Sequence, residues 1–279
     1  MRLQQLAAMS PQQMRKENGY RPIFAFDNAS FIYDPYPIGI STNVLPEDYY
    51  SRLIEEWPPT DLFMFKEELG KKYSLSQVNN PDGYHEFIKA SPSWQQFYRY
   101  IKSPEFVYEV IELFHCHNIN LGLPRIRVDH IHHLSNWKEH LKETLRRIKR
   151  FGTKGTTLSA RFEFSMLPAN KGCIKPHTDA PQKIITLVLS IVRAVEWDPA
   201  FDGGTVVLRP TDISQNYNYI NKQLEFHEVE TVTSFPFQPN QCVLFVKTFN
   251  SLHAVHPMTG ENSDAMRKTI TINIERCEG

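Results

Sequence analysis

The C-terminal half of the chain predicts a mainly β fold, and the N-terminal half predicts helices that flank it. Residues 184–191 and 242–246 are short, nearly continuous apolar runs rich in β-branched residues, which is typical of buried strands. A third run, 269–274, alternates strictly between polar and apolar residues, as a strand with two different faces does. Three such strands side by side would form one wall of a barrel.

Before residue 157, apolar side chains recur at helical spacing in three segments around a short β element. The first segment begins at Pro46 and is stopped by Pro58-Pro59, the second is capped by Ser103-Pro104, and the third carries a basic outer face. The apolar stripes are Tyr49, Tyr50, Leu53, Ile54 and Trp57 in the first segment, Phe106, Val107, Val110, Ile111 and Phe114 in the second, and Leu134, Trp137, Leu141, Leu145 and Ile148 in the third. We expect these helices to support the barrel.

The composition excludes several classes of partner. The 279 residues carry 31 basic and 31 acidic side chains, so no net charge draws the chain to nucleic acid or to an anionic membrane. The four cysteines form no Cys-x-x-Cys pair, which is typical of reduced thiols, and Met1–Tyr20 contains no continuous apolar stretch. We therefore expect a cytoplasmic protein without a signal peptide or a membrane span.

Two histidines, one carboxylate and one arginine lie beside the predicted strands. His177 and Asp179 form a His-x-Asp motif before the first strand, His253 follows the second, and Arg267 opens the third. The motif alone is weak, because roughly 0.4 matches are expected by chance. The strands, however, can bring all four groups to one mouth of a barrel. Two imidazoles and a carboxylate on one face of a metal indicate a non-haem Fe(II) centre that activates oxygen, and the arginine suits an anionic co-substrate.

From about Thr157 to Glu275 the chain resembles the 2-oxoglutarate and Fe(II)-dependent dioxygenase family, particularly its prolyl-hydroxylase-like branch. The resemblance is carried by the order of the motifs, which are Pro176-His177-Thr178-Asp179, residues 201–208, residues 241–245, residues 251–257 and Arg267-Lys268-Thr269. It implies a double-stranded β-helix, which is a jelly-roll, cupin-like barrel. It also implies a single catalytic domain over 1–279, with 1–156 as a helical and β support and 157–275 as the barrel core.

The resemblance also implies roles for five residues. His177, Asp179 and His253 would be the iron ligands and catalytic residues, while Arg267 would hold the distal carboxylate of 2-oxoglutarate with help from Thr269. Fe(II), 2-oxoglutarate and O2 would then support hydroxylation of an unactivated C–H bond, with release of succinate and CO2. Asp179 favours hydroxylation over halogenation, because a small apolar residue at that position would leave room for a halide.

Two alternatives remain open. The same cofactors could support desaturation, epimerisation or cyclisation, or the barrel could be a non-catalytic jelly-roll binding module. The expected substrate is a small molecule, because the balanced charge offers no obvious surface for a polymer, although a protein side chain is also possible.

The branch often has a tyrosine that touches 2-oxoglutarate on the strand before the His-x-Asp motif, and this chain has none there. Residues 161–166 instead place Arg161, Glu163 and Ser165 on one face of a strand. The other face carries two phenylalanines and a methionine. Either face could line the cavity.

Three further features receive simple interpretations. Residues 73–84 have strong turn chemistry at 79–83, which indicates a mobile loop over the site. Neighbouring histidines at 115–117 and 130–133 point in different directions, so they are not expected to bind one metal ion. His256 lies close to His253, but the order of the motifs favours His253 as the ligand.

Overall fold

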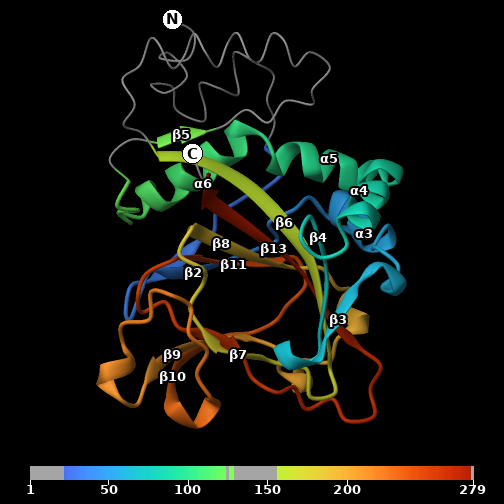
Figure 1. Cartoon of the computed structure of the whole chain (residues 1–279). Helices are drawn as coiled ribbons and strands as arrows, with labels where there is room; N and C mark the ends of the chain where they lie inside the picture. Colours follow the sequence, from blue (N-terminus) through green and yellow to red (C-terminus); the bar gives the residue numbers. More distant parts are fainter. Residues whose placement is uncertain (1–21, 124–125, 129–155, 278–279) are drawn as a thin grey trace, which may run out of the picture.

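The chain folds around two β-sheets that lie face to face, with helices over the outer side of the larger one (Figure 1). The computed structural model describes residues 22–123, 126–128 and 156–277. The third helical segment of the sequence analysis and the histidines at 130–133 lie outside these residues. In the part of the chain that is described, no helix has the length and apolar character needed to cross a lipid bilayer.

The larger sheet has nine strands, which follow the order β1-β2-β11-β8-β13-β6-β4-β3, with β5 beside β6. Every pair in it is antiparallel except β5 with β6. Its strands are β1 (Ser30–Ile32), β2 (Ile38–Thr42), β3 (Met64–Lys66), β4 (Lys72–Ser76), β5 (Ile126–Val128), β6 (Thr156–Pro168), β8 (Lys183–Ser190), β11 (Gln241–Val246) and β13 (Met266–Arg276).

The smaller sheet has four strands in the order β10-β9-β12-β7, all antiparallel. They are β7 (Ile174–His177), β9 (Thr205–Pro210), β10 (Val229–Phe235) and β12 (His253–Val255). The strands from β6 to β13 are shared equally between the two facing sheets, with β7, β9, β10 and β12 in the smaller and β6, β8, β11 and β13 in the larger, which is the arrangement of a double-stranded β-helix. The predicted fold class, mainly β with flanking helices, is therefore confirmed.

Two of the predicted helices are present as α3 and α6. The helices are α3 (Glu47–Glu55), α4 (Pro81–Ala90), α5 (Pro92–Ile101) and α6 (Pro104–Cys116). Short 3-10 turns are η1 (Thr60–Leu62), η2 (Glu67–Leu69), η3 (Ala194–Glu196), η4 (Pro199–Phe201), η5 (Ile213–Gln215) and η6 (Phe226–Glu228). Ser103 caps α6 as predicted, because its Oγ accepts a hydrogen bond from the backbone N–H of Phe106 at 3.2 Å. The predicted apolar stripe of α6 is buried along its length.

The expectation of a mobile loop across residues 73–84 is wrong. Most of the segment is regular, since β4 pairs with both β3 and β6, and α4 begins at Pro81. The turn chemistry is real but starts a helix. Asn80 adopts φ 55°, and its side chain accepts a hydrogen bond from the backbone N–H of Gly83 at 3.2 Å. A proline after an asparagine cap is a helix start as well as a turn signal.

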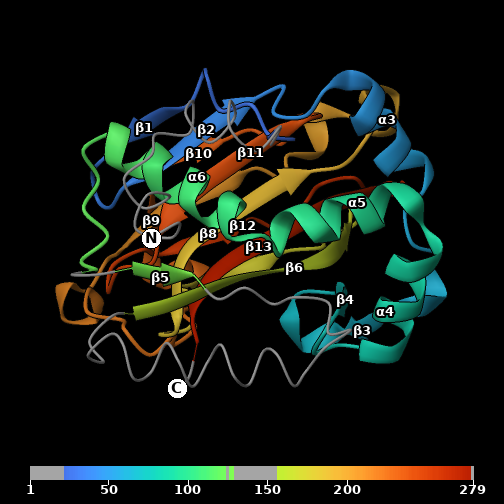
Figure 2. The same ribbon diagram turned by 90° about the horizontal axis from the view of Figure 1, so that it is seen from above.

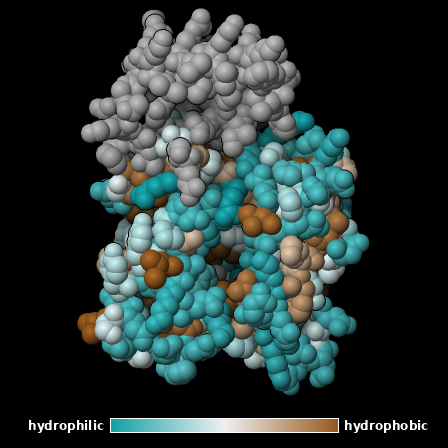
Figure 3. Space-filling view, viewed as in Figure 1, coloured by the Kyte–Doolittle hydropathy of each residue, from teal (hydrophilic) through white to brown (hydrophobic). Residues whose placement is uncertain are grey.

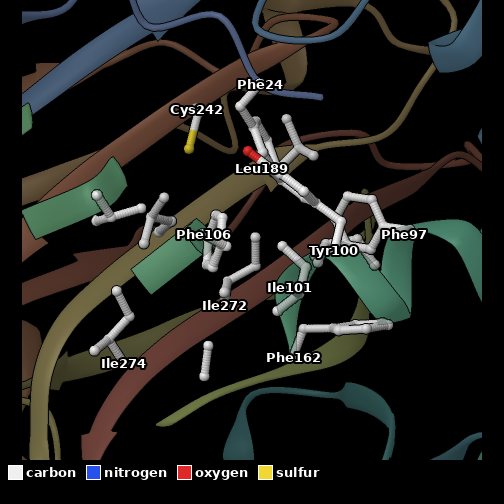
Figure 4. Close-up of a cluster of buried hydrophobic side chains, with 14 of the residues drawn as sticks. Phe24, Phe97, Tyr100, Ile101, Phe106, Phe162, Leu189, Cys242, Ile272 and Ile274 are labelled. Atoms are coloured by element: carbon white, nitrogen blue, oxygen red, sulfur yellow. The ribbon is translucent and has the colours of Figure 1, made fainter. Parts of the chain in front are cut away.

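The largest core cluster joins the helices to the outer face of the larger sheet. Figure 4 shows side chains of α5 and α6 packed against those of the strands, and Figure 2 shows α5 and α6 lying across that sheet. Phe162 and Phe164 of β6 are fully buried there, with ring centroids 5.2 Å from Phe97 and 4.7 Å from Trp94, respectively. Burying a phenylalanine contributes about 1.5–3 kcal/mol.

This packing decides which face of β6 lines the barrel. Because successive side chains of a strand point to opposite sides, the burial of Phe162 and Phe164 under the helices turns their neighbours to the inner side. Arg161, Glu163 and Ser165 therefore face the space between the two sheets. Figure 3 shows a hollow near the centre of this face of the molecule, at the level between the sheets.

Candidate active site

The predicted metal ligands come together between β7 and β12 of the smaller sheet. His177 ends β7, His253 begins β12, and the two residues are direct partners in the ladder. Their ring centroids lie 4.4 Å apart, and one ligand atom of each of His177, Asp179 and His253 lies within 4.8 Å of the others. No other group of three His, Cys, Asp or Glu residues converges in this way within the described ranges.

Both imidazoles are held in one tautomer. His177 Nδ1 lies 2.9 Å from the carbonyl oxygen of Lys175, and His253 Nδ1 lies 2.9 Å from that of Ser251. A carbonyl oxygen can only accept, so Nδ1 carries the proton in each ring and the Nε2 lone pair stays free. Burial, with the neighbouring charge of His253, lowers the pKa of His177 to about 3, and burial also lowers the pKa of His253. Both rings are therefore neutral near pH 7, as metal binding requires.

Asp179 is held as a carboxylate. Its Oδ1 accepts a hydrogen bond from Lys183 Nζ at 2.6 Å, and its Oδ2 accepts one from Thr186 Oγ1 at 2.5 Å. Burial opposes ionisation of Asp179, but Lys183 and the two histidines hold its pKa well below the usual range. Two neutral imidazoles and one carboxylate are a donor set that fits Fe(II) with an open face.

Arg267 is a buried cation without a carboxylate partner in the described part of the chain. It is 5% exposed, its Nε donates to the carbonyl oxygen of Gly203 at 2.5 Å, and its guanidinium carbon lies 4.8 Å from the ring centroid of Phe237. Burial lowers the pKa of Arg267 to about 10, although Asp202 opposes the shift, so the side chain stays charged near neutral pH. A buried charge is costly unless it is paired, which favours an anionic ligand here.

Three buried hydroxyl-bearing residues form a row beside Arg267. Thr269 lies two residues further along β13 on the same face, and its partners in the ladders are Ser165 of β6 and Ser190 of β8. All three are at most 5% exposed. The three residues lie on the inner wall of the larger sheet, on the same face as Arg267. The sequence alone does not predict Ser190 as a site residue, because only the register between β8 and β13 places it next to Thr269.

The backbone at Gly203 packs closely against the side chain of Arg267. It adopts φ +81°, and a Cβ atom there would lie 2.9 Å from Trp197 Cζ2, 3.0 Å from Met258 Sδ and 3.3 Å from Arg267 Cδ. A side chain at this position would be strained by the backbone and would push on the arginine. Glycine is therefore required where the loop before β9 meets the arginine.

The remaining inner wall of β6 is charged but internally paired. Arg161 donates two hydrogen bonds, at 2.7 and 2.8 Å, to the carboxylate of Glu275, and Glu163 forms an ion pair with Lys72. Of the two faces of β6 that the sequence allowed, the charged one therefore lines the barrel. Its charges are neutralised by ion pairs with Glu275 and Lys72. His256 lies apart from the ligands, with Nε2 3.3 Å from Thr231 Oγ1.

The site therefore has the donor set of a non-haem iron oxidoreductase. Residues 162–275 match the family model of the 2OG-Fe(II) oxygenase superfamily. Enzymes of that superfamily are oxidoreductases that use Fe(II), 2-oxoglutarate and O2.

Several solved structures are similar to this chain at low sequence identity. A prolyl-4-hydroxylase of Pseudomonas putida is 12% identical with a TM-score of 0.42, covering 88% of this chain and 95% of that one. A Trichoplax adhaerens prolyl hydroxylase, in complex with a hypoxia inducible factor peptide, is 13% identical with a TM-score of 0.44, covering 99% and 92%. The α-ketoglutarate dependent epimerase SnoN from nogalamycin biosynthesis is 10% identical with a TM-score of 0.46, covering 86% and 78%. No curated protein sequence matches the chain.

Proposed function

We propose that the protein is an Fe(II)/2-oxoglutarate-dependent dioxygenase that hydroxylates an unactivated C–H bond of a small molecule, with release of succinate and CO2. The observation that carries the proposal is the convergence of His177, Asp179 and His253, with both imidazoles oriented by backbone carbonyls and the carboxylate ionised. Bound Fe(II) would supply the oxygen activation.

The larger sheet provides the second half of the proposed site. Arg267 would pair the distal carboxylate of 2-oxoglutarate with its guanidinium, because the fork offers two parallel donors and Nε is already used by Gly203. The hydroxyl groups of Thr269, Ser165 and Ser190 would donate hydrogen bonds to the same carboxylate. The cluster of Trp197, Phe237 and neighbouring apolar residues would exclude water from this end of the co-substrate.

The test is anaerobic reconstitution with Fe(II), followed by titration with 2-oxoglutarate. Chelation of iron by the keto acid gives a weak visible charge-transfer band, which we expect in the wild type and not in Asp179→Ala. Arg267→Ala should need at least about tenfold more 2-oxoglutarate for the same band, because a charged hydrogen-bonded pair contributes about 1.5–3 kcal/mol. Arg276→Ala, at the exposed end of the same strand, is the matched control and should behave like the wild type.

Two other outcomes separate the alternatives. A folded wild-type protein without the band would favour a non-catalytic binding module. With the band present, the mass of the product identifies the reaction, since hydroxylation adds one oxygen atom, desaturation removes two hydrogen atoms and epimerisation leaves the mass unchanged.

A further inference from the structure

The connection between β9 and β10, drawn in orange in Figure 1, returns to the proposed iron site. Thr178, which stands between two of the proposed ligands and is fully buried, donates its Oγ1 hydrogen bond to the carbonyl oxygen of Asn218 at 2.6 Å. Further along, the backbone N–H of Leu224 donates to the carbonyl oxygen of Pro176 at 2.9 Å. The connection is thus held against the His-x-Asp segment at two points.

This connection exposes aromatic rings beside the site. Tyr217 is 73% exposed and stacks on Phe249, which is 44% exposed, with ring centroids 5.3 Å apart and planes 23° apart. The backbone N–H of Asn218 donates to the carbonyl oxygen of Phe249 at 2.8 Å, which ties the two segments together. Tyr219 follows, with 40% of its surface exposed. Exposed apolar groups gathered next to a proposed active site indicate a binding surface rather than scattered surface residues.

Lys247 adds a positive charge to the same place. Its Nζ lies 5.6 Å from the ring centroid of Tyr219 and 3.4 Å from the carbonyl oxygen of Asn218, the atom that also accepts from Thr178. Burial lowers the pKa of Lys247 to about 8; Asp179 opposes this shift and Lys183 adds to it, so Lys247 lies within electrostatic reach of the site.

The two lysines near the site differ in their partners. Lys183 is already engaged by Asp179 at 2.6 Å, whereas Lys247 forms no ion pair with any carboxylate in the described ranges. A partly buried ammonium group with only a carbonyl acceptor and an aromatic face gains most from an anionic ligand.

We propose that Lys247, Tyr217, Tyr219 and Phe249 form a substrate-binding rim for a small organic acid that carries a planar ring. The anionic group would pair with Lys247, and the ring would pack on the faces of the stacked Tyr217 and Phe249. The inference rests on the proposed function, since it names the substrate class of the same site. A compact acid suits this arrangement because the cation and the aromatic faces lie close together. Asn218 links them, since its carbonyl oxygen accepts from Lys247 and its backbone N–H donates to Phe249.

The test uses two probes of similar shape, the anion 3-phenylpropionate and its neutral amide 3-phenylpropanamide. Equilibrium dialysis against the full chain with excess 2-oxoglutarate, and without iron, measures both dissociation constants. We expect the wild type to bind the acid about tenfold more tightly than the amide, as a charged hydrogen bond predicts. Lys247→Met should remove this preference, Lys247→Arg should keep most of it, and the matched control Lys89→Met on α4 should leave it unchanged.

Tyr217→Ser and Phe249→Ser should weaken both probes by similar factors, because they remove ring contacts and no charge. Equal binding of acid and amide to the wild type, or an undiminished preference in Lys247→Met, would overturn the charge assignment. Unchanged binding of both probes to the ring variants would overturn the aromatic platform. Because this measurement needs neither iron nor turnover, its failure is distinct from failure of the charge-transfer band.

Discussion

The hydrogen bonds from the two histidine Nδ1 atoms to carbonyl oxygens show how single residues prepare this site. Each acceptor, on Lys175 or Ser251, lies two residues before its histidine in the chain. The backbone just before each histidine therefore sets the tautomer locally, without a separate carboxylate. This leaves Asp179 as the one anionic group among the three proposed ligands.

At the same scale, Gly203 gives a prediction about packing around Arg267. Gly203→Ala should destabilise the protein by about 1–3 kcal/mol, because the positive φ is strained for alanine and the added methyl group meets Trp197 and Met258. It should also weaken 2-oxoglutarate binding by displacing the arginine. Urea denaturation and the charge-transfer titration measure the two effects.

Gly122→Ala is the control for Gly203→Ala. Gly122 also has a positive φ, of +65°, but no heavy atom lies within 4 Å of the added methyl group. It should therefore show the backbone cost alone and leave co-substrate binding unchanged. Equal losses of stability in the two variants would contradict the argument from packing.

The residues of the site differ in how well the sequence predicts them. The proposed ligands and Arg267 could be recognised because each stands at a fixed distance from a strand-like run. The two histidines meet because β12 pairs with β7, which places His253 opposite His177. Ser190 carries no such signal, because its place beside Thr269 depends on register between strands about 80 residues apart.

Strand β6 shows that the sequence can predict which residues share a face without predicting which face points into the barrel. Alternation predicts that Arg161, Glu163 and Ser165 share one face, but either face of such a strand could be buried. The choice is made by α5, whose Trp94 and Phe97 cover the phenylalanine face. The start of α4 could not be recognised readily, because Asn80-Pro81 lies among turn residues that suit a loop equally well.

The junction between α3 and α5 yields a second prediction, about pH. Glu56 follows α3 and accepts hydrogen bonds from Ser91 Oγ at 2.7 Å, Ser93 Oγ at 2.6 Å and Ser93 N at 3.0 Å, at the start of α5. Although burial opposes it, these bonds lower the pKa of Glu56 below its usual 4.5. The stabilisation is therefore complete above about pH 4.5 and is lost as the pH falls through the lower folded pKa.

Glu56→Gln should accordingly lower the free energy of unfolding by about 1–3 kcal/mol near pH 7, and the difference from the wild type should shrink below about pH 4. Urea denaturation across this range measures it. Glu55→Gln is the neighbouring control, since Glu55 makes an exposed ion pair with Arg193 at 3.6 Å, and such pairs contribute little. A difference for Glu56→Gln that persisted at low pH would contradict the role of the charge.

For the whole molecule, the fold divides its two sheets between two tasks. The larger sheet shares its outer face with the helices in one core and presents Arg267 and the hydroxyl row inward. The smaller sheet supplies both histidines through β7 and β12. A metal ion and 2-oxoglutarate bound at once would therefore link the two sheets across the hollow between them (Figure 3).

This division predicts how cofactors change the stability of the whole chain. A ligand that binds only the folded state, at a concentration of about one hundred times its dissociation constant, stabilises that state by about 2.7 kcal/mol. For a chain of about 150–250 residues, this raises Tm by roughly 5–10 °C. We expect such a rise with anaerobic Fe(II) and a further rise with 2-oxoglutarate, measured by differential scanning calorimetry.

Asp179→Ala should lose both steps, because without the carboxylate the metal that chelates the keto acid is not held. Arg267→Ala should keep the first step and lose most of the second, since Arg267 belongs to the larger sheet and would contact the co-substrate rather than the metal. Loss of the iron step in Arg267→Ala, with the fold intact, would mean that the two sheets do not divide the cofactors in this way.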